Sequence, residues 1–205
     1  MKLSMQTRPV VSSLFRCGRR ATICLATVIV MLAIGGSAAY AGDQAVTLTF
    51  SGTSETSPTN LQQPNSTNDG DNFAGKSTLG AFTARNLRAI SSVLGSSDTC
   101  SGPNLLYYPE ISGASVIRFD DGSMIAMNLT QGADCIDLTT GLAHCTVTFQ
   151  IIGGSGRFVN ATGTLTMTET VGTVGVDALG NPVFFAATGK FAGTISGAAE
   201  HGGKR

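Results

Sequence analysis

Residues Thr164–Val171 read T-L-T-M-T-E-T-V, an almost unbroken alternation of threonine with larger side chains. Successive side chains of a β-strand point to opposite faces, so this stretch predicts a strand with threonines on one face and Leu165, Met167 and Glu169 on the other. A later run shows the same period of two, with these residues in one phase: Val183, Phe185, Ala187, Phe191 and Ile195. The pattern favours long strands with one apolar face.

Turn signals divide the second half of the chain into consecutive hairpins. The strands expected there are Ala114–Phe119, Ser123–Thr130, Cys135–Leu138, Leu142–Ile152, Ala161–Val176 and Pro182–Ser196. Asp120-Asp121-Gly122 is typical of a tight hairpin turn, and Thr139-Thr140-Gly141 and Asp177–Asn181 follow the same logic. Antiparallel hairpins must bury their apolar face and protect their edges, and closure into a barrel does both. We therefore predict an all-β fold, a single antiparallel closed β-barrel of about eight strands, with a sandwich as the alternative.

The first half of the barrel domain is harder to read. Ala45–Phe50 alternates and predicts one strand. The polar segment 51–78, with two prolines and an Asn/Asp/Gly cluster, predicts a long mobile loop. Asn86–Leu94 is compatible with a short helix or a bent strand, and Ser96–Gly113 resembles a loop.

Charge is distributed unevenly along the 205 residues, which carry 13 Lys+Arg and 13 Asp+Glu. Residues 1–41 hold five bases and no acid, so the remainder holds 13 − 5 = 8 bases against 13 acids, a net charge of −5. An acidic main domain excludes a basic nucleic-acid-binding surface.

The N-terminal 41 residues predict a signal peptide. A basic segment is followed by the uncharged run Ala21–Ile34 and by small residues ending in Ala39-Tyr40-Ala41. We expect cleavage between Ala41 and Gly42, a secreted or periplasmic barrel domain over 42–200, a frayed tail over 201–205, and no stable membrane insertion after cleavage. An uncleaved anchor is the alternative, because the small residues extend the apolar run.

Three cysteines remain after cleavage, so one disulfide at most forms within the chain. Cys135 and Cys145 flank a predicted turn and are the first candidates for that bond, although Cys100 can replace either partner. A catalytic cysteine is the less favoured reading, because His144 adjoins Cys145 in an extended run and points to the opposite face.

Three glycines in four residues mark a sharp reversal between two strands. Gly153, Gly154 and Gly156 permit positive φ and close backbone approach, so the segment through Arg157 and Phe158 predicts a structural turn at the barrel rim. We expect Phe158 to fold back over the lumen and Arg157 to pair with a carboxylate at the rim.

The run Ile151–Gly163, I-I-G-G-S-G-R-F-V-N-A-T-G, resembles the glycine signature of the allene oxide cyclase and dirigent-like barrel superfamily. The close match covers about 15 residues, and a looser strand layout covers residues 114–196. The resemblance implies an eight-stranded barrel with an apolar cavity, often trimeric, that works without metal or organic cofactor. Plant members cyclise an unsaturated fatty-acid epoxide or direct the coupling of phenoxy radicals. No catalytic role is carried over, because the signature describes a turn and strand packing.

One carboxylate lies in the apolar phase of a strand. If that phase faces the lumen, Glu169 is buried, its pKa rises, and it becomes a candidate general acid or base; the alternative is a solvated position at the barrel mouth. The expected pocket residues are Phe149, Leu165, Met167, Glu169 and Phe185. No motif predicts a metal site or a cofactor.

Two functions follow from these patterns. The first is an exported barrel that binds a small apolar molecule in its lumen and can act as a cofactor-free isomerase or cyclase. The second is a non-catalytic envelope or interaction protein, favoured by the low charge and the threonine-rich outer phase.

Overall fold

A computed structural model describes residues 42–57, 59 and 61–199. These residues form an all-β structure with a single turn of 3-10 helix. Its strands are β1 (Gln44–Thr56), β2 (Ser66–Ser77), β3 (Gly80–Ser91), β4 (Leu105–Phe119), β5 (Met124–Asp137), β6 (Leu142–Ser155), β7 (Thr162–Val176) and β8 (Pro182–Ser196), and the short helix η1 spans Gly156–Phe158.

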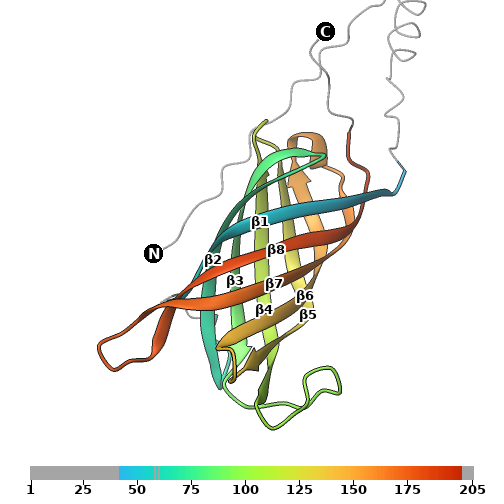
Figure 1. The fold of residues 1–205 in the computed structure, drawn as a ribbon. Helices are drawn as coiled ribbons and strands as arrows, with labels where there is room; N and C mark the ends of the chain where they lie inside the picture. Colours follow the sequence, from blue (N-terminus) through green and yellow to red (C-terminus); the bar gives the residue numbers. More distant parts are fainter. Residues whose placement is uncertain (1–41, 58, 60, 200–205) are drawn as a thin grey trace, which may run out of the picture. The chain divides into compact units, whose positions relative to one another are not determined.

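The eight strands form a closed barrel in sequence order, each antiparallel to its neighbours (Figure 1). Closure is made by β1 and β8, which pair from Gln44 opposite Ile195 to Glu55 opposite Phe184. The prediction of a closed antiparallel barrel is confirmed, and the sandwich alternative is wrong. A barrel of eight strands has an interior just wide enough to be filled by side chains or to hold one small ligand.

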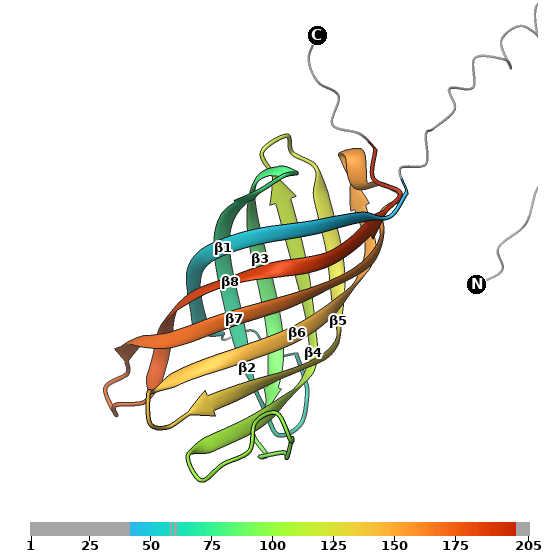
Figure 2. The ribbon, with the colours of Figure 1, turned by 45° about the vertical axis from the view of Figure 1, so that its right-hand side comes forward.

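The lumen has two ends, which we name by their loops. The packed end carries the β2–β3, β4–β5 and β6–β7 turns, and the open end carries the four other loops, including the long one between β3 and β4 (Figure 2). Apolar side chains fill the lumen toward the packed end, among them Leu48, Phe82, Phe119, Ile125 and Phe158, none more than 4% exposed.

The packed end is closed by the β6–β7 turn. Phe158, in η1, is fully buried, with its ring centroid 4.9 Å from that of Phe119. The guanidinium carbon of Arg157 lies 4.9 Å from the Phe119 centroid, and its Nε lies 3.2 Å from Asp121 Oδ2. Arg157 Nη2 also donates to the carbonyl of Leu79 in the β2–β3 turn. One arginine therefore links all three turns, and its predicted pairing with a carboxylate is confirmed.

The predicted mobile loop at 51–78 is wrong. Residues 51–56 complete β1, and Ser66–Ser77 form β2, which pairs with β1 and β3. Asn86–Ser91 belongs to β3 and is a strand, and the chain from Leu105 onward, expected as a loop, is already in β4. The polar composition of β2 has a physical reason: Asp71 forms an ion pair with the buried Arg88 inside the barrel, and Asp69 lies opposite Arg88 in the register.

The predicted signal peptide, residues 1–41, lies outside the described residues, which begin at Gly42. The predicted frayed tail, residues 201–205, also lies outside them. None of the helical structure in the described part of the chain has the length and hydrophobicity of a transmembrane helix.

Candidate functional site

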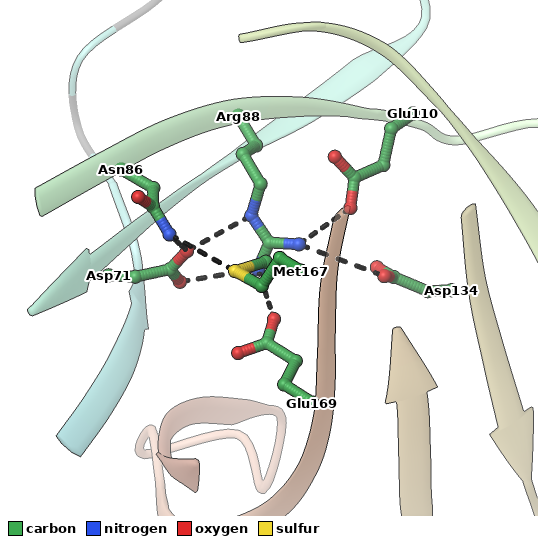
Figure 3. Close-up of polar contacts among 7 residues, drawn as sticks. All are labelled: Asp71, Asn86, Arg88, Glu110, Asp134, Met167 and Glu169. Carbon is green, nitrogen blue, oxygen red and sulfur yellow. Dashed lines mark hydrogen bonds and ion pairs between the residues drawn. The ribbon is translucent and has the colours of Figure 1, made fainter. Parts of the chain in front are cut away.

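The lumen is charged near the open end, where Arg88 of β3 is buried among carboxyl groups (Figure 3). Its Nε lies 3.0 Å from Asp71 Oδ2 on β2, its Nη1 donates to Glu110 Oε1 on β4 at 2.6 Å, and its Nη2 donates to Glu169 Oε1 on β7 at 3.0 Å. Asp134 Oδ1 on β5 lies farther away, 3.9 Å from Nη1. Arg88 is only 1% exposed.

Strand register explains why these groups meet. Asp69 is paired with Arg88 across β2 and β3, and Asp71, two residues along β2, shares its inward face. On the other side of the barrel, Asp134, Cys145 and Glu169 are paired across β5, β6 and β7, so all three side chains point into the lumen. The antiparallel ladder thus places one layer of polar groups around Arg88.

Two neutral residues complete the cluster. Asn86 Nδ2 donates to Asp71 Oδ2 at 2.9 Å and lies 3.5 Å from the sulfur of Met167. Met167 is completely buried. The charged layer therefore rests directly on the apolar core below it.

Two glycines leave room for the long polar side chains. A Cβ at Gly113 would lie 3.3 Å from Arg88 Cγ and 2.9 Å from the carbonyl oxygen of Leu87. A Cβ at Gly132 would lie 3.3 Å from both Cβ and Cδ of Glu110. Any larger residue at these positions would press on the cluster or on the adjacent backbone.

Burial and crowding control protonation in this layer. Burial raises the pKa of Glu110 to about 8 and that of Glu169 to about 7, in both cases against the attraction of Arg88. Burial likewise raises the pKa of the half-buried Asp69 to about 6, and Asp134 and Asp71 raise it further. Burial alone would lower the pKa of Arg88, but the surrounding carboxylates raise it well above its usual value. Carboxylic acids with pKa values near neutrality can donate as well as accept a proton.

A pocket of about 430 Å³ lies above this layer at the open end. Asp69, Arg88 and Asp134 provide its charged lining, and Ser54 and Thr173 add hydroxyl groups. Its apolar lining comes mainly from Ile136, Leu138, Ala143, Val171 and Phe185. The volume lies within the range of small-molecule sites, which combine a mostly apolar wall with a few polar groups.

Three carboxyl oxygen atoms of the cluster lack a hydrogen-bond partner within the described residues. They are Glu110 Oε2, Glu169 Oε2 and Asp134 Oδ1, all buried. Buried polar atoms are nearly always satisfied by protein, water or ligand. The layer therefore has hydrogen-bonding capacity that the chain itself does not use.

The structure separates the predicted pocket residues. Phe185 lines the pocket, whereas Phe149, Leu165 and Met167 are completely buried in the core below it. Glu169 is in the lumen, 4% exposed, and its partner is Arg88 rather than a purely apolar wall. The structure places Gly153 and Gly154 at the end of β6, and Gly156, Arg157 and Phe158 in η1 at the packed end, remote from this pocket.

The first candidate disulfide, Cys135–Cys145, is wrong: Cys135 is bonded to Cys100 of the β3–β4 loop. Cys135 is paired with His144 across β5 and β6, and Cys145 with Asp134, so the two cysteines lie on opposite faces of the barrel wall. Cys145 is a buried free thiol that lines the pocket. Burial, with Asp134 and Glu169 nearby, raises its thiol pKa well above the usual value, which makes it a poor nucleophile.

Sequence reasoning missed Arg88, Asp71 and Asp134 as site residues, and it placed Glu110 in a loop. A signal was present: Asn86 and Arg88 continue the phase of Phe82 and Ala84, which are buried. An arginine in the apolar phase of a strand indicates buried carboxylate partners, because a lone buried charge is too costly.

No protein-family model, no curated protein and no solved structure matches this chain.

Proposed function

We propose that this protein is an exported barrel that binds one small, largely apolar molecule in the pocket at its open end. The observation that carries the proposal is the contrast within one lumen: the packed end is filled by aromatic and aliphatic side chains, while the open end keeps a pocket of about 430 Å³ above a charged layer. A barrel that served only as a stable envelope component would gain more from a continuous apolar core than from a buried arginine.

The N-terminal sequence and the disulfide support export, and the glycine signature supports the family resemblance. The basic, apolar and small-residue order of residues 1–41 is typical of a signal peptide, and the Cys100–Cys135 disulfide suits an oxidising compartment. The glycine signature at Ile151–Gly163 suggests the allene oxide cyclase and dirigent-like superfamily, whose members bind apolar substrates and often form trimers. We include a homo-trimer in the proposal on that resemblance alone.

A cofactor-free isomerase or cyclase activity is the catalytic form of this proposal. Glu169 and Glu110, with pKa values raised to about 7 and about 8, lie in the layer below the pocket and do not line it. Asp69, which does line the pocket and has a pKa raised to about 6, is the carboxyl group that can exchange a proton with a bound molecule. Glu110 Oε2 and Glu169 Oε2 have no hydrogen-bond partner within the described residues. A non-catalytic envelope or interaction role is the alternative, supported by the threonine-rich outer face.

The pocket is tested with a neutral fluorescent probe, N-phenyl-1-naphthylamine, and the mature protein. We expect saturable binding that Val171→Phe weakens at least about tenfold, because the larger ring fills the pocket. Val174→Phe is the matched control: it makes the same change three residues away on β7, at a side chain that is 59% exposed. Equal binding by both variants and the parent protein would place the probe elsewhere and overturn the proposal.

A further inference from the structure

The carboxyl groups in and below the pocket outnumber the single cation among them, the guanidinium of Arg88. Arg88 already has Asp71, Glu110 and Glu169 within 3.2 Å, three carboxyl groups around one guanidinium. Asp134 and Asp69 then line the pocket itself. The lumen therefore holds five carboxyl groups around Arg88.

Asp134 lies at the boundary between the charged layer and the pocket. The residue is 8% exposed, and its Oδ1 has no hydrogen-bond partner within the described residues; the nearest cationic nitrogen is Arg88 Nη1 at 3.9 Å. Arg88 makes shorter contacts with three other carboxyl groups, so it gives Asp134 little compensation. The Asp134 side chain nevertheless lines the pocket, and apart from Arg88 the donor beside it is the neutral thiol of Cys145.

The apolar wall of the pocket can bind the apolar part of a ligand that also carries a cationic group. Ile136, Val171 and Phe185 contact the space above the carboxyl groups. An aromatic ring at the wall of an acidic pocket also suits a cation, because ammonium groups are attracted to aromatic faces.

We propose that the ligand of this pocket is a cationic amphiphile: a small molecule with an apolar body and one ammonium group, which pairs with Asp134 and Asp69. This inference rests on the proposed ligand-binding function and specifies its ligand class. The ammonium group pairs with the Asp134 and Asp69 carboxylates, while the apolar body lies against Val171 and Phe185.

The protonation of the carboxyl groups in and below the pocket determines how ligand binding depends on pH. The ionisable groups that face Asp69 and Asp134 are Asp71 on β2, Arg88 on β3, Glu110 on β4, Cys145 on β6 and Glu169 on β7. From β1 and β8 the pocket receives the uncharged Ser54, Pro182 and Phe185. A bound cation favours the ionised carboxylates, so binding releases protons wherever a carboxyl group is still protonated. Asp69, with its pKa raised to about 6, is half-buried, whereas the other ionisable groups of this set are buried.

The test compares three ligands that share one body and differ in the head group: 4-phenylbutylamine, 4-phenylbutan-1-ol and 4-phenylbutanoate. Each displaces N-phenyl-1-naphthylamine from the mature protein in a fluorescence titration. At neutral pH we expect the amine to bind at least about tenfold more tightly than the alcohol, and the carboxylate to bind most weakly. Affinity for the amine should rise from about pH 5 to about pH 7.5, whereas that of the alcohol should stay level.

Matched variants assign the selectivity to the pocket. Asp134→Asn and Asp69→Asn should each reduce the preference for the amine over the alcohol, and Asp69→Asn should also flatten the pH dependence. Glu55→Gln removes a carboxyl group from the exposed face of β1 and should leave both unchanged. Thermal unfolding of each variant verifies that the barrel is intact.

The outcomes separate the two proposals. If the neutral probe binds but the alcohol or the carboxylate matches the amine, the pocket stands and the cationic ligand class is wrong. If the neutral probe does not bind, and direct calorimetric titration of the three ligands also shows no binding, the proposed function fails with it. If Glu55→Gln lowers the amine preference as much as Asp134→Asn, the selectivity comes from overall charge, and the inference about the pocket is overturned.

Discussion

The two ends of the lumen solve the same packing problem in different ways. At the packed end, side chains such as Phe158 and Phe119 fill the space and exclude water, so burial of apolar surface stabilises the barrel there. Toward the open end, the interior is occupied by Arg88 and its carboxyl partners, and a pocket remains above them. One end is therefore arranged for stability, and the other keeps polar groups that apolar packing would have replaced.

The difference also concerns pH. Apolar packing does not depend on protonation, whereas the charged layer contains carboxyl groups whose pKa values are raised by burial. A perturbation at the packed end should therefore cost the same free energy at any pH near neutrality. A perturbation of the charged layer should cost a free energy that changes with pH.

The largest effect is expected from Phe158→Ala at the packed end. It removes a fully buried ring that contacts Phe119 and lies under the Arg157 guanidinium. We expect a loss of about 4 kcal/mol in the free energy of unfolding, from lost burial and a residual cavity. Urea unfolding at two pH values measures it, and the loss should be the same at both. Val159→Ala, at a 63% exposed neighbour, is the control. A loss below about 1 kcal/mol would show that the aromatic plug does not hold this end together.

Arg88→Met tests the charged layer. The variant keeps the length of the side chain but leaves Glu110, Glu169 and Asp71 without their cation, and removing one partner of a buried ion cluster costs about 3 kcal/mol or more. The loss should be larger at about pH 8 than at about pH 5, because acidification neutralises Glu110 and Glu169, whose pKa values are raised to about 8 and about 7.

Arg85→Met on the same strand is the matched control, since Arg85 is exposed on the outer face. If Arg88→Met destabilises equally at both pH values, the contrast between the two ends in pH response is wrong.

Much of the barrel could be predicted because its second half alternates cleanly. β7 presents Leu165, Met167 and Val171 to the lumen, and their apolar character alone identifies the buried face. β2 has the same geometry, but Asp69 and Asp71 occupy its inward phase, and only Phe73 gives an apolar signal. A method that expects apolar residues inside must therefore read β2 as a loop.

The site was predictable only in part for a related reason. Glu169 could be found, because it interrupts an otherwise apolar phase. Its partner Arg88 comes 81 residues earlier, and no local pattern connects the two. Their pairing depends on barrel closure and on a register that runs through all the strands between them, which is information that a single strand does not contain.

Cys100→Ser tests how much the disulfide at the open end stabilises the barrel. The Cys100–Cys135 bond connects the β3–β4 loop to β5 across a sequence separation of 35 residues. We expect a loss of about 3 kcal/mol, mainly from the freed entropy of the unfolded chain. The double variant with Cys135→Ser should lose no more than the single one. An additive second loss would show that Cys135 stabilises the barrel by packing rather than through the bond.

The smallest and most specific effect is expected from Glu110→Gln. The folded-state pKa of Glu110 is raised to about 8, above its ordinary value of 4.5, so the folded protein binds this proton more tightly than the unfolded chain. The stability from that proton is fully present below about pH 4.5 and is lost as the pH rises toward about 8. Glutamine mimics the protonated acid and can still accept from Arg88, so the variant should match the parent near pH 5 and become relatively more stable near pH 8. Glu55→Gln, on the outer face of β1, should leave the slope unchanged. Parallel stability curves for Glu110→Gln and the parent protein across this range would mean that Glu110 is ionised throughout, and that the open end is a permanent ion cluster rather than a titrating one.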